Sequence, residues 1–225
     1  LLYWKKINIL NFSALKKELN KFMPEYMIHL AARTDLSGSS IEDYTENFDG
    51  ITNLLSILNN LESIKRVVFA SSMLVCQRGY FPKNNNDYSP NTVYGESKVY
   101  GEEILKNAKK INFESIIVRP TSIWGPWFRE PYLNYFLMIK NRRFFLFRNK
   151  MATKTFGFVG NTVNQIDSLL FKYKSLQQNE VFYLGDGNPL NIEDWSIHIS
   201  KVFGYSKLLS FPAIFAKFLS KFGDF

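Results

Sequence analysis

The sequence predicts an α/β fold in which a doubly wound parallel sheet is followed by a smaller C-terminal region. Short apolar runs alternate with helical patterns along the first half of the chain, which is the rhythm of a parallel sheet. The runs 67–69 (Val-Val-Phe) and 116–118 (Ile-Ile-Val) are apolar without alternation, as strands covered on both faces require. After Pro126 the chain changes to closely spaced aromatic residues, which indicates a different region.

The elements of the sheet follow from these patterns in chain order. We expect strands at residues 7–10, 26–31, 66–70 and 115–119. We expect helices at residues 13–22, 52–61 and 94–109, the first of them capped by Ser13. A last helix should begin at Asn191 and run to about Phe203, because acidic residues occupy its first turn and Gly204 follows its end.

The change of composition suggests two regions. Residues 1–126 are expected to form the ligand-binding α/β domain, and residues 127–225 mainly a substrate-binding region. Part of the segment 154–172 is expected to return to the sheet of the first domain.

Composition narrows the classes of function. The 225 residues carry a formal net charge of +8 but no apolar run near the roughly 20 residues that a membrane span needs. Cys76 is the single cysteine, which suits a reducing cytoplasm. The basic stretch 140–150 is interrupted by Phe144 to Phe147, and no nucleic-acid-binding signature accompanies it. We therefore expect a cytoplasmic protein with no nucleic acid, membrane or metal partner.

Tyr94 and Lys98 are the first candidates for chemistry. Four residues apart on a helix, they project from one face, one turn apart. A free tyrosine titrates near a pKa of about 10, and a nearby positive charge favours its phenolate. The spacing alone is a weak signal, because it also arises on solvated helix faces.

Two serine hydroxyls at the end of an expected strand are the next candidates for chemistry. Ser71 and Ser72 end the apolar run that begins at Val67, and the carboxyl ends of strands are where a doubly wound sheet presents its ligand-binding groups. A serine there can also simply cap a turn. A polar stretch, residues 77–92, separates these hydroxyls from Tyr94.

Together these segments resemble the extended short-chain dehydrogenase/reductases, specifically their NAD-dependent epimerase/dehydratase branch, and the fold they imply is Rossmann-like. Five segments match this branch in order over nearly the whole chain. They are residues 29–32 (His-Leu-Ala-Ala), Asn47 with Gly50, Asn53 and Leu54, residues 69–72 (Phe-Ala-Ser-Ser), residues 94–98 (Tyr-Gly-Glu-Ser-Lys) and residues 119–126 (Arg-Pro-Thr-Ser-Ile-Trp-Gly-Pro).

The resemblance implies roles for particular residues. Tyr94 would take the proton of a secondary alcohol, Lys98 would hold the nicotinamide ribose and favour the Tyr94 phenolate, and Ser72 would hydrogen-bond the reacting oxygen. The implied cofactor, NAD or NADP, would contact Asn8, Ile9, Leu30, Ala31, Ala32, Asn47, Ser71, Tyr94, Lys98 and Pro120. The implied substrate would contact Ser72, Met73, Ser122 and Lys154.

The chain also departs from the family pattern. It contains no glycine-rich phosphate loop, and because residues 7–10 look like the family's third strand, we expect that the first strands are missing. Met73 and Leu74 stand where the family's dehydratases carry an acidic pair, which disfavours elimination of water. Ser122 stands where asparagine is usual, and Lys154 where many members have an arginine for the substrate diphosphate.

Three functions remain open from the sequence. The first is a nucleotide-sugar epimerase that transiently oxidises a secondary alcohol of a nucleoside-diphosphate sugar. The second is an NAD(P)H-dependent reductase of a keto sugar or another carbonyl compound, which would use the same three side chains. The third is a cofactor-sensing protein without catalysis, which the intact Ser72, Tyr94 and Lys98 disfavour. A homodimer is compatible with the resemblance.

Overall fold

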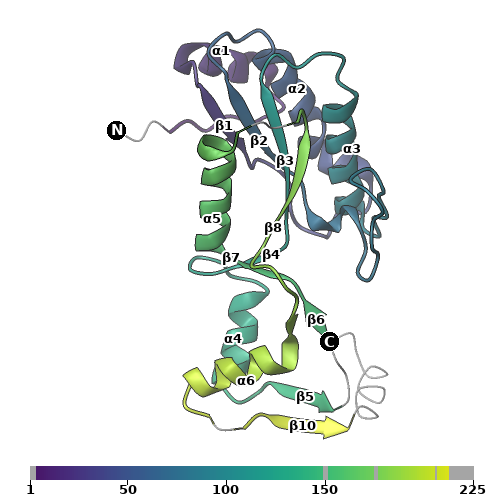
Figure 1. Cartoon of the computed structure of the whole chain (residues 1–225), viewed down its shortest axis with the longest axis vertical. Coiled ribbons are helices and arrows are strands. Elements are labelled where there is room, and N and C mark those ends of the chain that lie inside the picture. Colours follow the sequence, from purple (N-terminus) through teal and green to yellow (C-terminus); the bar gives the residue numbers. More distant parts are fainter. Residues whose placement is uncertain (1–3, 149–151, 175–176, 206, 213–225) are drawn as a thin grey trace. The chain divides into compact units, whose positions relative to one another are not determined.

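The computed structural model describes residues 4–148, 152–174, 177–205 and 207–212 (Figure 1). The chain divides into two compact units. Unit 1 comprises residues 1–121 and 163–184, and unit 2 comprises residues 122–162 and 185–225.

The core of unit 1 is a four-stranded parallel sheet with the order β1-β2-β3-β8. Its strands are β1 (Tyr26–His29), β2 (Arg66–Ala70), β3 (Glu114–Pro120) and β8 (Glu180–Leu184). The polar side chains that follow β2 therefore lie at the same edge of the sheet as the carboxyl ends of its neighbours.

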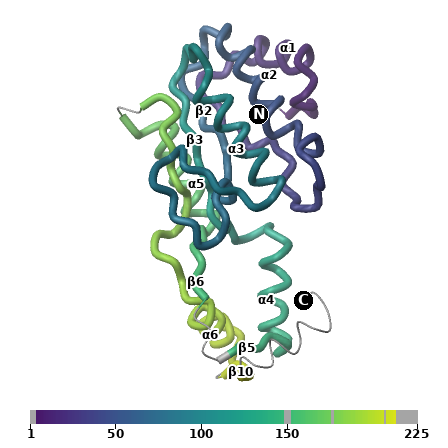
Figure 2. The backbone as a smooth tube through the Cα atoms, turned by 90° about the vertical axis from the view of Figure 1, so that its right-hand side faces the viewer, coloured from purple at the N-terminus to yellow at the C-terminus, as the bar shows by residue number. Residues whose placement is uncertain are grey.

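Helices cover both faces of this sheet (Figure 1). On one face, Val67 and Phe69 of β2 pack with α1 (Phe12–Phe22), α2 (Asp49–Leu58) and α3 (Val93–Asn107). On the other face, Val68 packs with α5 (Val159–Asp167) and η3 (Ser168–Lys172), a π-helical turn. Both views show α1 beside α2 (Figures 1 and 2). Apolar burial on both faces explains why β2 and β3 lack the alternation of a half-exposed strand.

Two short helical segments complete unit 1. The segment η1 (Ile41–Asn47) leads into α2, and η2 (Met73–Val75) directly follows the end of β2. The α/β class and the parallel sheet are thus confirmed.

The strand expected at residues 7–10 was wrong, because Ile9 and Leu10 form a turn. The side chain of Asn8 accepts a hydrogen bond from the Leu10 amide at 2.9 Å, and Asn11 rather than Ser13 caps α1. Asparagine side chains that bond nearby amides favour turns and caps over strands, so they override the short apolar run.

The other boundaries in unit 1 shift by a few residues. β1 ends at His29 rather than at residue 31, because its pairing with β2 ends there. α2 begins at Asp49 and ends at Leu58, earlier than expected at both ends. α3 begins at Val93 and ends two residues before the expected limit.

Unit 2 consists of short elements around a cluster of aromatic rings. Its strands are β4 (Ser122–Trp124), β5 (Phe145–Arg148), β6 (Thr153–Lys154), β7 (Phe156–Phe158), β9 (Leu190–Asn191) and β10 (Leu209–Pro212). Its helices are α4 (Tyr132–Lys140) and α6 (Ile192–Val202). Trp195 of α6 lies at the centre of the cluster, with its ring 4.2 Å from that of Phe156 and 5.1 Å from that of Tyr135.

The helix predicted from Asn191 is confirmed as α6. The Asn191 side chain accepts hydrogen bonds from the amides of Glu193 and Asp194, and Gly204 after the helix has a φ of +81°. Within the described ranges, no helix is long and apolar enough to pass through a bilayer.

Candidate active site

The end of β2 presents the two serines that the sequence singled out. The Ser71 amide donates to the Val118 carbonyl of β3 at 2.7 Å, which keeps this end of the strand in the sheet. Ser72 then caps η2, because its Oγ accepts a hydrogen bond from the Leu74 amide at 3.1 Å. The hydroxyl hydrogen of Ser72 is left to donate elsewhere. Met73, the first residue of η2, is half-buried.

Tyr94 reaches Ser72 through the close packing of α3 on η2. Thr92 caps α3 by accepting a hydrogen bond from the Gly95 amide at 3.0 Å. A Cβ atom at Gly95 would overlap the carbonyl oxygen of Leu74, so only glycine allows this approach. The first turn of α3 therefore carries Tyr94 to within interaction range of the Ser72 hydroxyl.

The environment of Tyr94 acts on its pKa in two directions. The side chain is buried, and this burial raises the pKa of the Tyr94 phenol above its ordinary value. The Ser72 hydroxyl opposes the increase by hydrogen bonding. Burial dominates, so in this structure the phenol holds its proton at neutral pH.

Lys98 lies one turn further along α3. Its Nζ donates a hydrogen bond to the Ala70 carbonyl at 3.1 Å and lies 5.9 Å from the centroid of the Tyr94 ring. The side chain is only 5% exposed, and burial lowers the pKa of Lys98 to about 8 although the charge of Glu102 opposes the shift. Lys98 is thus mostly charged at pH 7.

His29, at the end of β1, is buried against Phe69, with 5.8 Å between the ring centroids. Burial, and secondarily the charge of Lys98, lowers the pKa of His29 to about 4, so its imidazole is neutral at pH 7. The next residues leave the sheet: Leu30 and Ala31 are exposed and Ala32 is half-buried.

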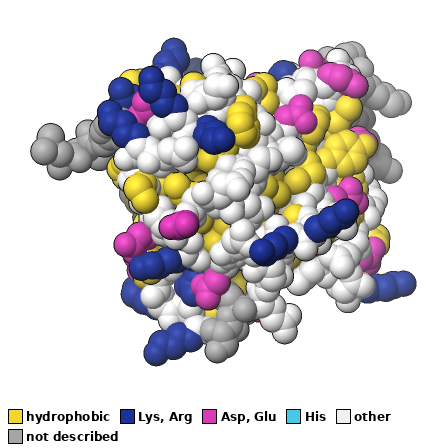
Figure 3. All heavy atoms as spheres, turned by 90° about the horizontal axis from the view of Figure 1, so that it is seen from above, with side chains coloured by type: hydrophobic (Ala, Val, Ile, Leu, Met, Phe, Trp, Pro, Cys, Tyr) yellow, Lys and Arg dark blue, Asp and Glu magenta, His cyan; other side chains and the backbone are white. Residues whose placement is uncertain are grey.

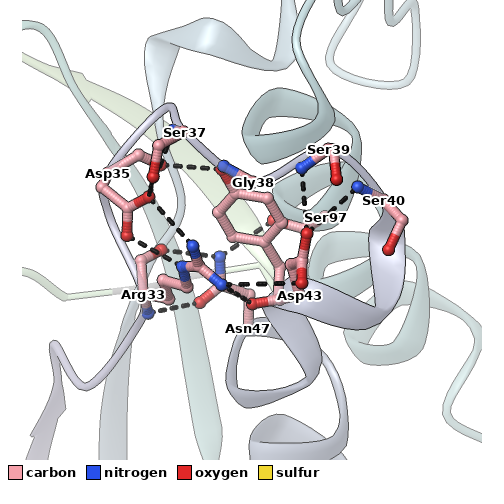
Figure 4. Close-up of polar contacts among 10 residues, drawn as sticks. Arg33, Asp35, Ser37, Gly38, Ser39, Ser40, Asp43, Asn47 and Ser97 are labelled. Atoms are coloured by element: carbon pink, nitrogen blue, oxygen red, sulfur yellow. Dashed lines mark hydrogen bonds and ion pairs between the residues drawn. The ribbon is translucent and has the colours of Figure 1, made fainter.

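Asn47 ties the loop after β1 to α3 (Figure 4). Its Oδ1 accepts from the Arg33 amide at 2.8 Å, and its Nδ2 donates to the Arg33 carbonyl and to Ser97 Oγ, each at 2.9 Å. Ser97 in turn donates to the Tyr94 carbonyl at 2.7 Å. A buried Asn47 therefore acts as a brace between the loop and the turn of α3 that carries Tyr94.

No sequence pattern predicted the cluster of polar contacts that closes this loop, in which Arg33, Asp35 and Asp43 lie together (Figure 4). The Arg33 guanidinium donates to Asp35 and to the Asp43 carbonyl, each at 2.8 Å, and lies 5.0 Å from the Tyr44 ring centroid. Tyr44 is fully buried and its ring lies 6.1 Å from that of Tyr94. The loop thus builds one wall beside Tyr94.

The sequence also missed a buried polar network behind Ser71. Glu102 on α3 accepts from Ser71 Oγ at 2.6 Å and from the Arg119 guanidinium at 2.8 and 2.7 Å. Burial raises the pKa of Glu102, but hydrogen bonds and charge from Arg119 outweigh it and keep that pKa below its ordinary value. The signal was present: Glu102 lies two helical turns from Tyr94, on the same face of α3.

Other predicted contact residues lie in unit 1 with different neighbours. The Ile9 carbonyl accepts from Asn53 of α2 at 3.1 Å, and the Ile9 side chain packs closely against Gly50. Asn8 belongs to the same turn, and Pro120 is the last residue of β3. Asn8 and Ile9 thus contact this turn and α2.

Ser122 and Lys154 lie in unit 2, where both meet Tyr132. Burial raises the pKa of the Tyr132 phenol, and a hydrogen-bonding interaction with Ser122 opposes that rise. The Lys154 Nζ lies 5.7 Å from the Tyr132 ring centroid and 5.5 Å from that of Phe156. These two predicted substrate-binding residues are therefore neighbours of one aromatic ring.

A surface hollow lies at the opposite end of the sheet in unit 1. It is lined by the first residues of three strands, Tyr26, Arg66 and Glu114, and by Phe171. Figure 3 views the molecule from above and shows apolar side chains at the surface among basic and acidic ones. Ligands of doubly wound sheets bind at the carboxyl ends of the strands, so this hollow is separate from the candidate site.

The carboxyl edge offers small side chains and hydrogen-bond donors suited to the nicotinamide-ribose end of a dinucleotide. Ala31 and Ala32 leave the backbone after β1 accessible beside small side chains. Lys98 uses one of its three donor hydrogens on the Ala70 carbonyl, so two remain for ribose hydroxyls. Across the described ranges, no group of three or more His, Cys, Asp or Glu side chains is arranged to hold a metal ion.

Proteins with similar sequences include some that are named as sugar 4-epimerases. The chain is 28% identical over 184 residues to the N-acetyl-α-D-glucosaminyl-diphospho-ditrans,octacis-undecaprenol 4-epimerase of Escherichia coli O157:H7, covering 80% of the chain and 54% of that protein. It is also 28% identical over 195 residues to a putative UDP-glucose 4-epimerase of Methanocaldococcus jannaschii, covering 80% of the chain and 61% of that protein. The chain thus spans less than two thirds of the length of both relatives.

Among solved structures, UDP-glucuronic acid 4-epimerase from Bacillus cereus, in complex with UDP-glucuronic acid and NAD, matches with a TM-score of 0.73. The match covers 91% of this chain and 66% of that one, at 20% identity, and so concerns the fold. A sequence profile of the NAD dependent epimerase/dehydratase family matches residues 2–185. The chain therefore belongs to the NAD-dependent epimerase/dehydratase family of extended short-chain dehydrogenase/reductases.

Proposed function

We propose that this protein is an NAD-dependent 4-epimerase of a hexose carried on a diphosphate. The observation that carries the proposal is the arrangement of Ser72, Tyr94 and Lys98 at the carboxyl end of the sheet. The names of two relatives support the substrate class, since one contains a sugar on undecaprenyl diphosphate and the other UDP-glucose. Their shared chemistry is a hexose linked to a diphosphate.

Tyr94 and Ser72 perform the proton chemistry in this proposal. NAD, when bound, supplies a group that accepts a hydride from carbon and returns it. The Tyr94 oxygen takes the proton of the C4 hydroxyl as C4 becomes a ketone, and returns that proton when the C–H bond re-forms on the opposite face. Ser72 donates its hydroxyl hydrogen to the reacting oxygen, because the bond that its Oγ accepts from the Leu74 amide leaves the O–H hydrogen available to donate.

Lys98 supplies the positive charge that the first step requires. Burial raises the pKa of Tyr94, so the phenolate must be favoured by a cation close to the ring. Lys98, 5.9 Å from the ring centroid and charged at pH 7, has this property. Its remaining donor hydrogens would hold the nicotinamide ribose.

In this proposal the two units bind different molecules. Unit 1 would hold the dinucleotide, with Leu30, Ala31 and Ala32 beneath it and Asn47 bracing that loop. Unit 2 would hold the sugar diphosphate, with Lys154 meeting the phosphates and Ser122 the sugar. The side chains of Met73 and Leu74 have no ionisable group that could transfer a proton, so elimination of water from the sugar is not expected.

The test is incubation of the purified protein with NAD and either UDP-glucose or UDP-N-acetylglucosamine, with the undecaprenyl-diphosphate sugar in a third arm. Proton NMR should show inversion at C4 with no net formation of NADH, and Tyr94→Phe should abolish the inversion. Stoichiometric consumption of reduced cofactor with a keto sugar would instead identify a reductase. Accumulation of a 4-keto-6-deoxy sugar would contradict the role given to Met73 and Leu74.

A further inference from the structure

Two side chains one turn apart on α3 hold two consecutive residues at the end of β2. Lys98 Nζ donates to the Ala70 carbonyl at 3.1 Å, and Glu102 accepts from Ser71 Oγ at 2.6 Å. The next residue along the chain is Ser72, whose Oγ caps η2. The position of the Ser72 hydroxyl therefore depends on the strand end that these two contacts fix.

The Glu102 carboxylate is held from the opposite side by Arg119 of β3. The Nε of Arg119 donates to Oε1 at 2.8 Å and its Nη2 donates to Oε2 at 2.7 Å. The two side chains are 1% and 0% exposed. A planar guanidinium bonded to both oxygens fixes the orientation of a carboxylate as well as its place.

The two carboxylate oxygens serve different parts of unit 1. Oε1 is shared by Arg119 and Ser71, so it is the oxygen that reaches the end of β2. Oε2 accepts from Tyr88, in the polar stretch 77–92, at 2.8 Å and from Lys106 of α3 at 3.1 Å. It therefore bonds to parts of unit 1 other than the end of β2. Each link can therefore be removed without removing the other.

We propose that Glu102 is a positioning residue of this site: oriented by Arg119, its carboxylate holds Ser71 and thereby keeps Ser72 placed against Tyr94. The inference rests on the proposed function for its effect on turnover, but its structural part does not depend on it.

Electrostatics connect the same carboxylate to Lys98. The ionisable side chains that act on Lys98 are Tyr94 and Glu102 on α3 and His29 on β1. His29 is neutral because its pKa is lowered to about 4, and Tyr94 keeps its proton. Glu102 is thus the negative charge that opposes the loss of the Lys98 proton in the buried site.

The decisive pair of variants is Ser71→Ala and Tyr88→Phe. Each removes one hydroxyl that donates to Glu102 and leaves the Glu102 and Arg119 charges in place. In Ser71→Ala we expect hydrogen exchange of the Leu74 amide to accelerate about tenfold and kcat to fall about tenfold or more. In Tyr88→Phe the exchange rate of the Leu74 amide and kcat should both stay within about twofold of the wild type. Equal effects in the two variants, or none in Ser71→Ala, would overturn the proposal.

A third variant tests the charge. Glu102→Gln leaves Arg119 without its buried partner and will lower stability. The pKa of Lys98 is therefore measured by NMR titration of ε-13C-labelled lysine, under conditions where the variant is folded. The pKa of Lys98 should lie near 8 in the wild type and lower in Glu102→Gln, because the opposing negative charge is gone. An unchanged pKa would overturn the coupling of Glu102 to the site. If the wild type shows no epimerase activity, the exchange and titration results still decide the role of Glu102, and only the proposed function fails.

Discussion

The carboxyl edge of the sheet in unit 1 and the aromatic cluster of unit 2 are held together by different kinds of interaction. In unit 1 the carboxyl edge of the sheet is fixed by charges and directional hydrogen bonds, such as those between Glu102 and Arg119. In unit 2 the elements meet through aromatic rings around Trp195, whose ring contacts those of Trp124, Tyr135, Phe136 and Phe156.

The difference reflects what each interior must specify. A hydrogen bond to a buried carboxylate fixes an atom in distance and direction, and its loss leaves a charge unsatisfied. Ring packing tolerates changes of shape as long as volume is approximately kept. Unit 1 is therefore expected to lose stability sharply when a charge partner of the buried carboxylate is removed, whereas unit 2 should respond gradually to loss of volume.

The largest expected effect comes from one oxygen atom in unit 1. Tyr94→Phe should lower kcat by about 10²- to 10⁴-fold, because only the proton-transferring group is removed. Cofactor affinity and melting temperature should stay near the wild type, as calorimetric titration and thermal melting can measure. Tyr100→Phe, on the exposed face of the same helix with its hydroxyl on Glu96, is the matched control. Retention of more than a tenth of the rate by Tyr94→Phe would exclude its assigned role.

The next effect is on the stability of unit 1. Arg119→Met keeps an unbranched chain but removes the buried cation that bonds both Glu102 oxygens and leaves only Lys106 at one of them, which costs about 3–5 kcal/mol of unfolding free energy. Urea denaturation should show this as a lower midpoint. Lys172→Met, which breaks the exposed pair with Asp167, should leave the midpoint unchanged. Equal losses in the two variants would contradict the importance given to the buried network.

A smaller loss is expected for a comparable change in unit 2. Trp195→Phe keeps an aromatic ring in the cluster and should cost about 1–2 kcal/mol, because part of the lost volume can be repacked. The matched control is Trp127→Phe, since the Trp127 side chain is 99% exposed. A loss for Trp195→Phe as large as that for Arg119→Met would remove the contrast between the two interiors.

The last expected effect is a pH dependence of stability. Burial lowers the pKa of Lys98 to about 8, so below that pH the folded protein bears the cost of a buried charge. Between pH 8 and the ordinary lysine pKa of 10.5, the folded state has already released this proton and the cost disappears. Lys98→Met should therefore melt higher than the wild type at pH 7, and the difference should shrink toward pH 10. A difference independent of pH, as expected for Lys172→Met, would show that Lys98 is not buried as a cation at pH 7.

The sequence predicted the local elements of unit 1 better than their limits. Apolar runs without alternation identified β2 and β3, and the cap at Asn191 identified α6, because these signals depend on neighbouring residues. The run at Ile9 was misread because two asparagines bond the nearby backbone and form a turn. The limits of β1 depend on the partner strand, which no local pattern contains.

By itself the sequence determined the parallel α/β class and the family, together with the spacing that puts Tyr94 and Lys98 on one helix face. Only the tertiary structure decided that Glu102 and Arg119 form a buried pair behind Ser71, and that Asn47 joins Arg33 to Ser97. Helical periodicity and strand hydrophobicity act over a few residues, so a sequence displays them directly. Contacts such as that between Ser71 and Glu102 join residues on different elements, and they become visible when the packing of α3 against the sheet brings those residues together.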